Sequence, residues 1–372
     1  MIHIFIGTKA QYVKTAPVIK ELDKRGIEYN LIDSGQHAAL AKDYRDYFKI
    51  RAPDRILSIS GEDIKTVSAM LVWFGRILSL IMFSSKQLFE NIFRGEKGVC
   101  LVHGDTPTTL LSVLAAKRSG LKVVHLESGL RSYNIFHPFP EELIRIATMR
   151  WSDYLFAPSP WAFDNLKKMG LSHKSFLIGG NSNIDALEYA KSLDPPLAPG
   201  LLENERFVIV SIHRAETILN RNRLQKVVEL VQRLGRDYKV LLCVHPPTRK
   251  QLQKYGFING LESTQGVILR DLLPYPQFIR SIQKAYFIVT DGGSVQEESY
   301  YLGVPCLLMC NRTERLEGIN KNVYISEFDD RRIDYFRNKI EQFRCSDYQK
   351  PAQSPSAEIV DILLSQILLA QK

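Results

Sequence analysis

Short apolar runs alternate with helical patterns along almost all of this chain of 372 residues. Strands that are buried on both faces and separated by helices are typical of parallel sheets built from βαβ units. The alternation therefore predicts an α/β protein. The runs that we expect to form strands are residues 2–6, 29–33, 99–103, 122–125, 154–157, 207–212, 239–244, 267–269, 287–289 and 306–309.

The alternation pauses in the middle of the chain, at residues 178–182 and at the proline-rich residues 195–200, and then restarts. A chain of this length with 45% hydrophobic residues has enough material for two cores. We therefore expect two doubly wound, Rossmann-like domains facing a cleft, the first over residues 1–177 and the second over residues 178–353. A final helix within residues 354–372 is expected to pack back on the first domain. Ligands of such sheets bind at the carboxyl ends of the strands.

The formal net charge of +9 fits a nucleic acid, an anionic membrane or an anionic small substrate as partner. Lysines and arginines are scattered among acidic residues, and no basic strand studded with aromatic residues appears. We therefore predict no nucleic-acid partner. An anionic sugar nucleotide and a membrane surface both remain open.

Cofactor and metal motifs are absent from the sequence. It contains no P-loop and no Gly-x-Gly-x-x-Gly pattern, so we expect no nicotinamide cofactor. The five cysteines form no Cys-x-x-Cys pair and no Cys/His cluster, so we expect no metal and reduced thiols. The first residues are typical of a strand and not of a signal peptide, which predicts a cytoplasmic protein.

Residues 67–83 are strongly apolar but fall short of the ~20 residues that a helix needs to span a bilayer. A subunit interface, an internal core helix and a membrane-contacting surface are all compatible with this composition. We predict a homodimer that uses this helix, with peripheral membrane contact as the alternative.

The turn after the expected strand at residues 287–289 suits an anion. Gly292 and Gly293 let the backbone approach a ligand, and the helix that begins near Ser294 offers free N–H groups and the positive end of its dipole. Further along this helix, the carboxylates of Glu297 and Glu298 are placed to accept hydrogen bonds from a ribose. The segment therefore suits a nucleoside diphosphate, and the plain alternative is a solvated helix start capped by Asp or Ser.

Three carboxylates in the first domain follow expected strands or begin a helix. Asp105 and Glu127 come just after the strands at 99–103 and 122–125, and Glu141 begins a helix. A helix N-cap explains Asp105, and the helix dipole explains Glu141, without any function. If the three converge, they raise one another's pKa and make proton abstraction from carbon feasible.

Two histidines and an arginine follow expected strands in the second domain. His213 and His245 come directly after the strands at 207–212 and 239–244, and Arg315 follows the strand at 306–309. Histidines at such positions are often structural, and Arg315 is equally typical of a surface. Beside a diphosphate, the histidines would instead donate to a departing phosphate oxygen and Arg315 would add counter-charge.

Taken together, these segments resemble the UDP-N-acetylglucosamine 2-epimerase family, which has a GT-B-like fold. The resemblance runs from Gly7 to about Glu317. It rests on Ser34-Gly35-Gln36-His37, His103-Gly104-Asp105-Thr106, His125-Leu126-Glu127-Ser128-Gly129-Leu130-Arg131, Pro140-Glu141-Glu142, Gly180-Asn181, His213-Arg214, Gln296-Glu297-Glu298 and Thr313-Glu314-Arg315. By this resemblance the catalytic positions are Asp105, Glu127, Glu141 and His213. The positions that bind nucleotide or substrate are Lys14, Arg145, His245, Gly292, Gly293, Ser294, Glu298 and Arg315.

The resemblance implies a reaction that needs no cofactor. UDP is eliminated across C1 and C2 of the sugar to give a 2-acetamidoglucal, and UDP then adds back at the other face. The product would be UDP-N-acetylmannosamine, for cell-surface polysaccharide synthesis. In the hydrolysing variant of the reaction, water adds instead, and free N-acetylmannosamine leaves with UDP.

Several positions depart from the family pattern. The opening Gly-Thr-Arg-Pro-Glu of the family is here Gly7-Thr8-Lys9-Ala10-Gln11. At Lys9, a position expected to bind substrate, a single ammonium group therefore replaces the planar guanidinium of arginine. The asparagine before Arg145 is Ile144, and Ser-Gly-Gly becomes Gly292-Gly293-Ser294. A GT-B glycosyltransferase with a lipid-linked acceptor uses the same fold and diphosphate site. It stays an alternative, as does a nucleotide-sugar-binding protein without catalysis.

Overall fold

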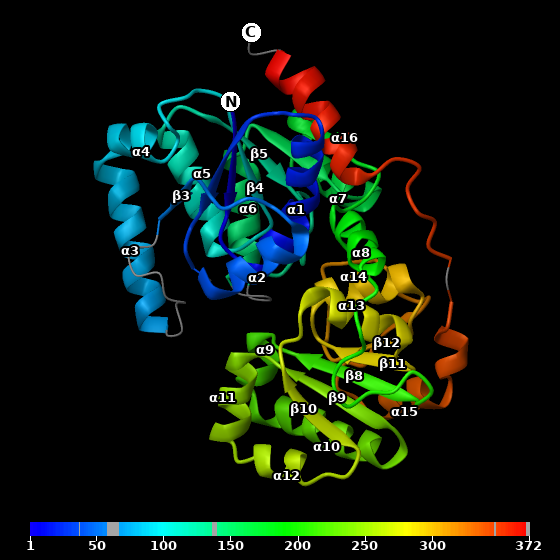
Figure 1. Cartoon of the computed structure of the whole chain (residues 1–372). Coiled ribbons are helices and arrows are strands. Elements are labelled where there is room, and N and C mark those ends of the chain that lie inside the picture. Colours follow the sequence, from blue (N-terminus) through cyan, green and yellow to red (C-terminus); the bar gives the residue numbers. More distant parts are fainter. Residues whose placement is uncertain (37, 58–66, 136–139, 346, 370–372) are drawn as a thin grey trace. The chain divides into compact units, whose positions relative to one another are not determined.

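The computed structural model describes the chain except residues 37, 58–66, 136–139, 346 and 370–372. The chain divides into two compact units (Figure 1). Unit 1 comprises Met1–Ala186 together with Pro351–Lys372, and unit 2 comprises Leu187–Lys350. Each unit contains its own parallel sheet, so the predicted α/β class with two doubly wound sheets is confirmed.

Unit 1 is organised around a seven-stranded sheet in the order β3-β2-β1-β4-β5-β6-β7, in which the paired strands are parallel. The winding reverses between β1 and β4, which is the point where open α/β sheets bind their ligands. The strands are β1 (Ile2–Ile6), β2 (Tyr29–Asp33), β3 (Arg55–Ile56), β4 (Val99–His103), β5 (Lys122–Leu126), β6 (Tyr154–Ala157) and β7 (Ser175–Leu177). The helices are α1 (Lys9–Lys24), α2 (Ala38–Phe48), α3 (Val67–Phe83), α4 (Ser85–Asn91), α5 (Pro107–Arg118), α6 (Glu141–Trp151), α7 (Pro160–Lys168), α8 (Asn183–Ser192), which continues into unit 2, and α16 (Pro355–Ile362).

Unit 2 is organised around a six-stranded parallel sheet in the order β10-β9-β8-β11-β12-β13. Its winding reverses between β8 and β11. The strands are β8 (Phe207–Ile212), β9 (Lys239–Val244), β10 (Val267–Asp271), β11 (Phe287–Thr290), β12 (Cys306–Leu308) and β13 (Val323–Ile325). The helices are α9 (Ala215–Ile218), α10 (Arg221–Asp237), α11 (Pro246–Lys254), α12 (Ile258–Glu262), α13 (Tyr275–Lys284), α14 (Gly293–Leu302) and α15 (Asp330–Asn338).

Every strand expected from the apolar pattern is present, with ends that shift by one or two residues. The pattern missed β3, β7 and β13, which have two or three residues each and lie at sheet edges. Both residues of β3 are exposed, so this strand has no apolar run to detect. These short strands are mostly exposed or half-buried, so they contain no long apolar run in the sequence.

Helix α3 has the predicted bounds and is buried along one side only. Trp73, Ile77 and Ile81 recur at every fourth residue and pack into the core of unit 1 beside α5. Val72 and Met82 lie on the exposed side, and Phe83 is 86% exposed. The alternative of an internal core helix is therefore wrong. Within the described residues, no helix combines the length and apolarity that a membrane crossing requires.

The C-terminal segment returns to unit 1. Helix α16 packs on α1, as the neighbouring red and blue ribbons of Figure 1 show. The guanidinium of Arg25, the C-cap residue of α1, donates to Asp361 at 2.5 Å, and the carboxylate of Glu358 accepts from the backbone N–H of Gly179 at 2.8 Å. Ile359 and Leu363 of this segment are buried.

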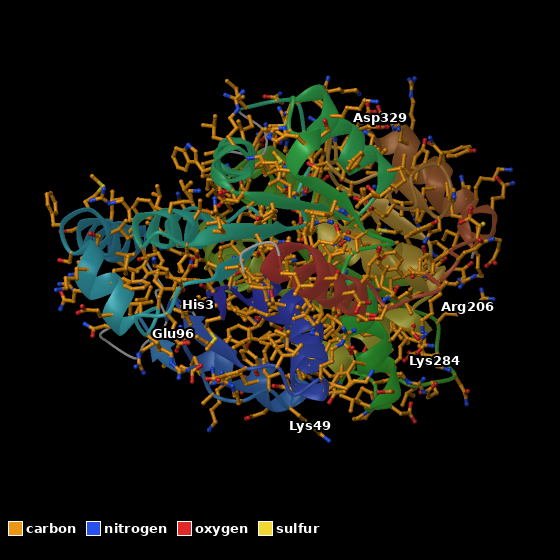
Figure 2. The ribbon with its side chains drawn as sticks, turned by 90° about the horizontal axis from the view of Figure 1, so that it is seen from above. His3, Lys49, Glu96, Arg206, Lys284 and Asp329 are labelled. Carbon is orange, nitrogen blue, oxygen red and sulfur yellow. The ribbon has the colours of Figure 1, made fainter. Side chains whose placement is uncertain are left out.

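The first strand is fixed by a buried histidine. His3 and Glu96 are labelled in Figure 2. His3 Nε2 donates to the carbonyl oxygen of Glu96 at 3.0 Å, and Nδ1 accepts from the amide of Asn30 at 3.0 Å. Since one nitrogen donates and the other accepts, the ring is neutral. Burial lowers the pKa of His3 to about 4.

Candidate functional site

The predicted catalytic carboxylates of unit 1 lie at the carboxyl ends of β4 and β5. Asp105 follows β4 by two residues, and Glu127 follows β5 directly. Because neighbouring parallel strands end at the same sheet edge, the two side chains share one region. Their charges both act on the buried imidazole of His103. Thr106, and not Asp105, is the N-cap of α5, so the capping explanation for Asp105 is wrong.

Glu127 stands in a backbone conformation that side chains other than glycine rarely adopt, with φ of 61°. Ser128 holds this turn by donating from its N–H to Phe156 at 2.9 Å and from its hydroxyl to His125 at 2.7 Å. A Cβ on Gly129 would lie 2.2 Å from the carbonyl oxygen of Ala162, so the turn packs directly on backbone. A strained residue held this tightly is typical of a functional position.

The carboxylate of Glu127 forms a buried ion pair with Lys14. The ammonium group of Lys14 donates to both carboxylate oxygens, at 2.7 and 2.8 Å, and both side chains are about 5% exposed. His103 Nε2 lies 3.3 Å from the second oxygen. Burial lowers the pKa of His103 to about 3, so this ring is neutral near pH 7. Lys14, predicted to bind substrate, thus contacts a predicted catalytic group.

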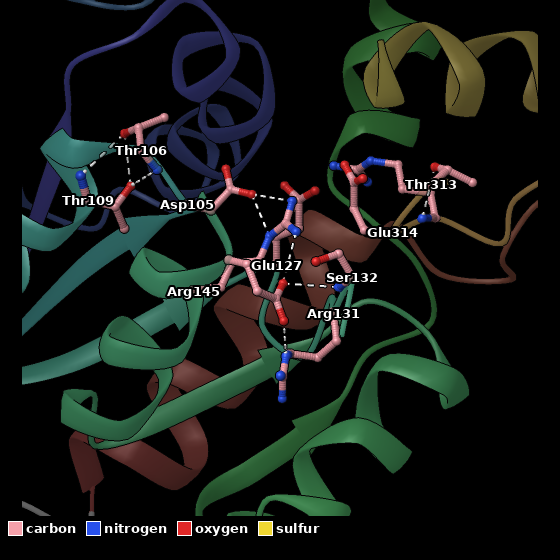
Figure 3. A network of polar contacts seen from close by, with 12 residues as sticks. Asp105, Thr106, Thr109, Glu127, Arg131, Ser132, Arg145, Thr313 and Glu314 are labelled. Atoms are coloured by element: carbon pink, nitrogen blue, oxygen red, sulfur yellow. Dashed lines mark hydrogen bonds and ion pairs between the residues drawn. The ribbon is translucent and has the colours of Figure 1, made fainter. Parts of the chain in front are cut away.

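Asp105 belongs to a second charged network, drawn in Figure 3. Arg145 donates from Nε to Oδ2 of Asp105 at 2.6 Å, and its Nη1 lies 3.4 Å from Glu142. Glu142 also accepts from the guanidinium of Arg131 and from the backbone N–H of Ser132 at 3.0 Å. Burial alone would raise the pKa of Glu142, but this N–H and the two guanidinium groups outweigh it and hold the pKa below its usual value.

Glu142, the second residue of α6, joins this network and is the neighbour of Glu141, the glutamate predicted to be catalytic. Glu141 is the first residue of α6 and is half-buried, whereas Glu142 is fully buried between two arginines. Both glutamates belong to the Pro140-Glu141-Glu142 motif, and they differ in the direction in which their side chains leave the helix. The catalytic role of Glu141 stays a prediction.

The first loop is held by an amide where the family pattern has a carboxylate. Gln11 accepts from the backbone N–H groups of Gly7 and Thr8, at 2.8 and 3.0 Å. Its own amide donates to the carbonyl oxygen of His103 and to the hydroxyl of Thr109, at 2.8 and 2.9 Å. An amide serves both kinds of partner because it carries a donor and an acceptor. Gln11 thus ties the ends of β1 and β4 together.

Lys9 stands at the start of α1, close to this loop. Its ammonium group lies 5.8 Å from the ring centroid of Tyr44 in α2. This is a cation–π contact within unit 1. The role of Lys9 in binding substrate stays a prediction.

In unit 2, the carboxylate of Asp291 joins the ends of β8 and β11. It accepts from the backbone N–H groups of His213 and Arg214, at 2.9 and 3.0 Å. Gly292 is the N-cap of α14 and makes no side-chain cap hydrogen bond, so the alternative of an Asp or Ser cap is wrong. The amides that begin α14, at Gly293 and Ser294, form the positive end of the helix, which suits an anion.

The two predicted histidines of unit 2 lie against each other. The rings of His213 and His245 stack with centroids 4.4 Å apart and planes 22° apart. His213 Nδ1 lies 3.7 Å from Asp291. A Cβ on Gly292 would lie 2.5 Å from Cε1 of His213, so the ring occupies the space that glycine leaves.

Arg315 lies on the other side of the same helix start. Its guanidinium pairs with the buried carboxylate of Glu297, and a Cβ on Gly293 would lie 2.6 Å from its Nε. Gln296 fixes the backbone of this segment by donating to the carbonyl oxygen of Arg315 at 3.1 Å. Arg315 is therefore buried and held in place, and the alternative of an ordinary surface arginine is wrong. Glu298 is also buried on α14, and its contact with a ribose stays a prediction.

A second arginine of unit 2 was not among the predicted site residues. Arg214 donates to both oxygens of Glu314, at 2.8 and 3.0 Å. Burial alone would lower the pKa of Arg214, but the Glu314 carboxylate outweighs it and raises the pKa. Among the described residues, no group of three or more His, Cys, Asp or Glu side chains is arranged to hold a metal ion.

Comparison with known proteins identifies the family. The sequence pattern of UDP-N-acetylglucosamine 2-epimerases matches residues 20–355. The UDP-N-acetylglucosamine 2-epimerase of Methanococcus maripaludis is 31% identical over 86% of both chains. The UDP-2,3-diacetamido-2,3-dideoxy-D-glucuronate 2-epimerase of Pseudomonas aeruginosa is 30% identical over 90% of this chain and 91% of its own.

A solved structure agrees with these relatives. The UDP-GlcNAc 2-epimerase of Methanocaldococcus jannaschii, solved with UDP-GlcNAc and UDP, superposes with a TM-score of 0.83 and 26% identity, covering 97% of this chain and 99% of its own. The resemblance seen in the sequence motifs is thereby confirmed. The chain belongs to the UDP-N-acetylglucosamine 2-epimerase family of sugar-nucleotide epimerases.

Proposed function

We propose that this enzyme converts UDP-N-acetylglucosamine into UDP-N-acetylmannosamine by eliminating UDP and adding it back, for cell-surface polysaccharide synthesis. The observation that carries the proposal is Glu127, a charged residue held in a strained turn at the carboxyl end of β5. Its region also contains Asp105, and the acid/base chemistry at C2 of the sugar is ascribed to this part of unit 1. Binding of UDP is ascribed to unit 2.

The first step of the proposed reaction breaks two bonds of the substrate. A carboxylate of unit 1 takes the proton from C2, the C–H electrons form the C1–C2 double bond, and the C1–O bond electrons leave with UDP. The products of this step are UDP and 2-acetamidoglucal. The second step reverses both changes from the other face, because C2 receives a proton and a phosphate oxygen of UDP attacks C1.

The leaving diphosphate acquires negative charge as the C1–O bond breaks. The amides at the start of α14 supply fixed donors for that charge, and Arg315 and His213 stand against the two glycines of the same helix start. Donors that are already in place cost no reorganisation at the moment of reaction. His213 and Arg315 are therefore proposed to stabilise UDP as it leaves, with His245 stacked on His213.

Product analysis tests the proposal and separates it from hydrolysis. Incubation with UDP-GlcNAc should give a mixture of two UDP-linked sugars, visible by phosphorus and proton NMR. Free N-acetylmannosamine together with UDP would mean that water adds to the glycal. A transfer of the sugar to a lipid acceptor without epimerisation would contradict the proposal. The diacetamido-glucuronate nucleotide of the Pseudomonas relative should be assayed in parallel, because it differs at C3 and C6 of the sugar.

We further propose that the enzyme is a homodimer that buries the exposed side of α3. Val72, Met82 and Phe83 lie on that side, and such a surface on a helix marks an interaction site. Phe83→Glu should dissociate the dimer in analytical ultracentrifugation. Leu202→Glu, at another exposed apolar residue in unit 2, is the matched control and should leave the dimer intact. Flotation of a monomeric protein with anionic vesicles would instead favour membrane contact.

A further inference from the structure

Resting on the proposed function, we propose that Gln11 is a positioning residue. Its side-chain amide holds the loop between β4 and α5, and thereby keeps the carboxylate of Asp105 in place for the reaction at C2 of the sugar. Gln11 is the third residue of α1, and its side chain is buried. Both ends of its amide are engaged, each with a different loop.

The oxygen of the Gln11 amide faces the loop between β1 and α1. It accepts from the backbone N–H groups of Gly7 and Thr8, at 2.8 and 3.0 Å. The hydroxyl of Thr8 accepts in turn from the backbone N–H of Gln11, which completes a capping box. A backbone N–H can only donate, so the atom that Gly7 and Thr8 face is the oxygen. This end of the amide therefore fixes the residues that follow β1.

The nitrogen of the same amide faces the loop between β4 and α5. It donates to the carbonyl oxygen of His103 at 2.8 Å and to the hydroxyl of Thr109 at 2.9 Å, and the hydroxyl of Thr106 lies at 3.3 Å. The hydroxyl of Thr109 itself donates to the carbonyl oxygen of His103 at 2.8 Å. That bond uses its one hydrogen, so toward Gln11 the hydroxyl accepts. The donor end of the amide is therefore fixed as well.

These contacts enclose Asp105 on both sides along the chain. Gln11 holds the carbonyl group of His103, two residues before Asp105, and approaches the hydroxyl of Thr106, the residue after it. Thr106 is the N-cap of α5 and forms a capping box with Thr109, which Figure 3 draws together with Asp105. A shift of this loop would therefore move the backbone that carries the Asp105 carboxylate.

The loop has a second anchor on its other side. The chain leaves β4 at Gly104 with φ of 73°, and the carbonyl oxygen of Gly104 accepts from Nε2 of His125 at 2.8 Å. Burial lowers the pKa of His125 to about 4, so this ring is neutral near pH 7. The anchor at His125 stays in place when Gln11 is replaced. Loss of the Gln11 amide should therefore displace the loop without unfolding it.

The first variant removes both ends of the amide. Gln11→Met keeps the length of the side chain and loses its acceptor and its donor. We expect kcat with UDP-GlcNAc, and the exchange of deuterium into C2 in heavy water, to fall on the order of a hundredfold, as when a reacting group is displaced by about 1 Å. The affinity for UDP and the KM should change little, because UDP binding is ascribed to unit 2. A raised KM with wild-type kcat overturns the proposal.

Asn30→Leu is the matched control for a loss of stability. Asn30 is a fully buried amide of the same sheet, and it donates to the carbonyl oxygen of Ile92 at 2.9 Å. It lies near the amino end of β2, at the opposite end of the sheet from Asp105. The control should unfold more easily in urea and keep the wild-type kcat per folded molecule. Equal losses of kcat in Asn30→Leu and Gln11→Met would mean that Gln11 acts only through stability, which overturns the proposal.

A double-mutant cycle tests whether Gln11 acts through Asp105. D105N alone should slow the exchange at C2 by roughly a hundred- to ten-thousand-fold, as for a group in acid/base catalysis. The double variant Q11M/D105N should exchange no more slowly than D105N, because no carboxylate is left to position. Losses that multiply in the double variant overturn the proposal.

Gln11→Glu tests the donor end alone. The carboxylate keeps an acceptor for Gly7 and Thr8, but its second oxygen would face the carbonyl oxygen of His103 at about 2.8 Å with no hydrogen between them. This variant should therefore also lower kcat, although it restores the residue of the family pattern. Turnover of Gln11→Glu at the wild-type rate overturns the proposal. If Gln11→Met does not fold, Gln11→Glu takes its place in the cycle with D105N.

The proposed function and the role of Gln11 fail in different ways. Wild-type enzyme that binds UDP and exchanges no deuterium at C2 overturns the proposed function. Wild-type exchange at C2 together with multiplying losses in the cycle overturns only the positioning role of Gln11.

Discussion

Replacing Gly292 by alanine should displace the ring of His213 and leave the fold of unit 2 intact. A Cβ at this position would lie 2.5 Å from Cε1 of His213, whereas carbon atoms in contact need about 3.5 Å. The backbone φ of −90° is one that alanine adopts freely, so the steric conflict is the main perturbation. The ring must therefore move by about 1 Å, the difference between these two distances.

The size of the effect follows from that displacement. Misplacing a reacting group by about 1 Å costs on the order of a hundredfold in rate. Overpacking of this kind costs about 1–3 kcal/mol of stability. We expect Gly292→Ala to lower kcat about a hundredfold and to change UDP affinity much less, because Arg315 and the remaining amides of α14 stay in place.

The assay measures kcat by NMR, UDP affinity by calorimetry and the free energy of unfolding in urea. Gly260→Ala is the matched control, since its Cβ would meet only the flexible amide of Gln232, at 3.4 Å. The control should turn over at the wild-type rate. A folded Gly292→Ala enzyme with wild-type kcat would refute the idea that the position of His213 controls the rate.

Three further predictions concern charges. Glu142→Gln removes the fully buried carboxylate that Arg131 and Arg145 contact and should lower the free energy of unfolding by about 3–5 kcal/mol; an unchanged urea midpoint would contradict the network of Figure 3. Burial lowers the pKa of His3 and His125 to about 4 and the pKa of His103 to about 3. Below pH ~6.5 the unfolded chain takes up protons on these histidines that the folded protein does not. The free energy of unfolding should therefore fall by on the order of 2 kcal/mol per histidine between pH 6.5 and 5. A free energy of unfolding, measured in urea, that stays constant or rises toward pH 5 would be inconsistent with neutral buried rings. Arg315→Lys exchanges a planar fork for a point charge and should weaken UDP binding about tenfold or more in calorimetry, with thermal unfolding as the control for a global effect.

The strand-end residues were predictable because parallel strands place their carboxyl ends at one edge of each sheet. Asp105, Glu127 and His213 each follow an apolar run, and this position alone assigns them to the edge that binds ligands. The same rule located the helix start at Gly292 and Gly293. These features depend only on local sequence, so they can be read without knowledge of the packing.

The partners of these residues were not predictable, because they come from distant parts of the chain. Lys14 is separated from Glu127 by 113 positions, and nothing in its own helix distinguishes it from a lysine that binds substrate. Glu141 and Glu142 differ by about 100° around a helix, and only the fold shows that Glu142 contacts Arg131 and Arg145. From the sequence, Gln11 only replaces a carboxylate of the family pattern by an uncharged amide. In the structure this amide both accepts from the backbone N–H of Gly7 and donates to the carbonyl oxygen of His103.

Turnover in heavy water is the most direct test of the central claim, that this enzyme breaks and remakes the C2–H bond of its sugar nucleotide. Wild-type protein is incubated with UDP-GlcNAc in deuterated buffer, and C2 of substrate and product is examined by proton NMR and mass spectrometry. The account predicts one deuterium at C2 of the epimerised product. A protein that binds UDP and leaves the C2 proton in place with both UDP-GlcNAc and the diacetamido-glucuronate nucleotide would contradict it.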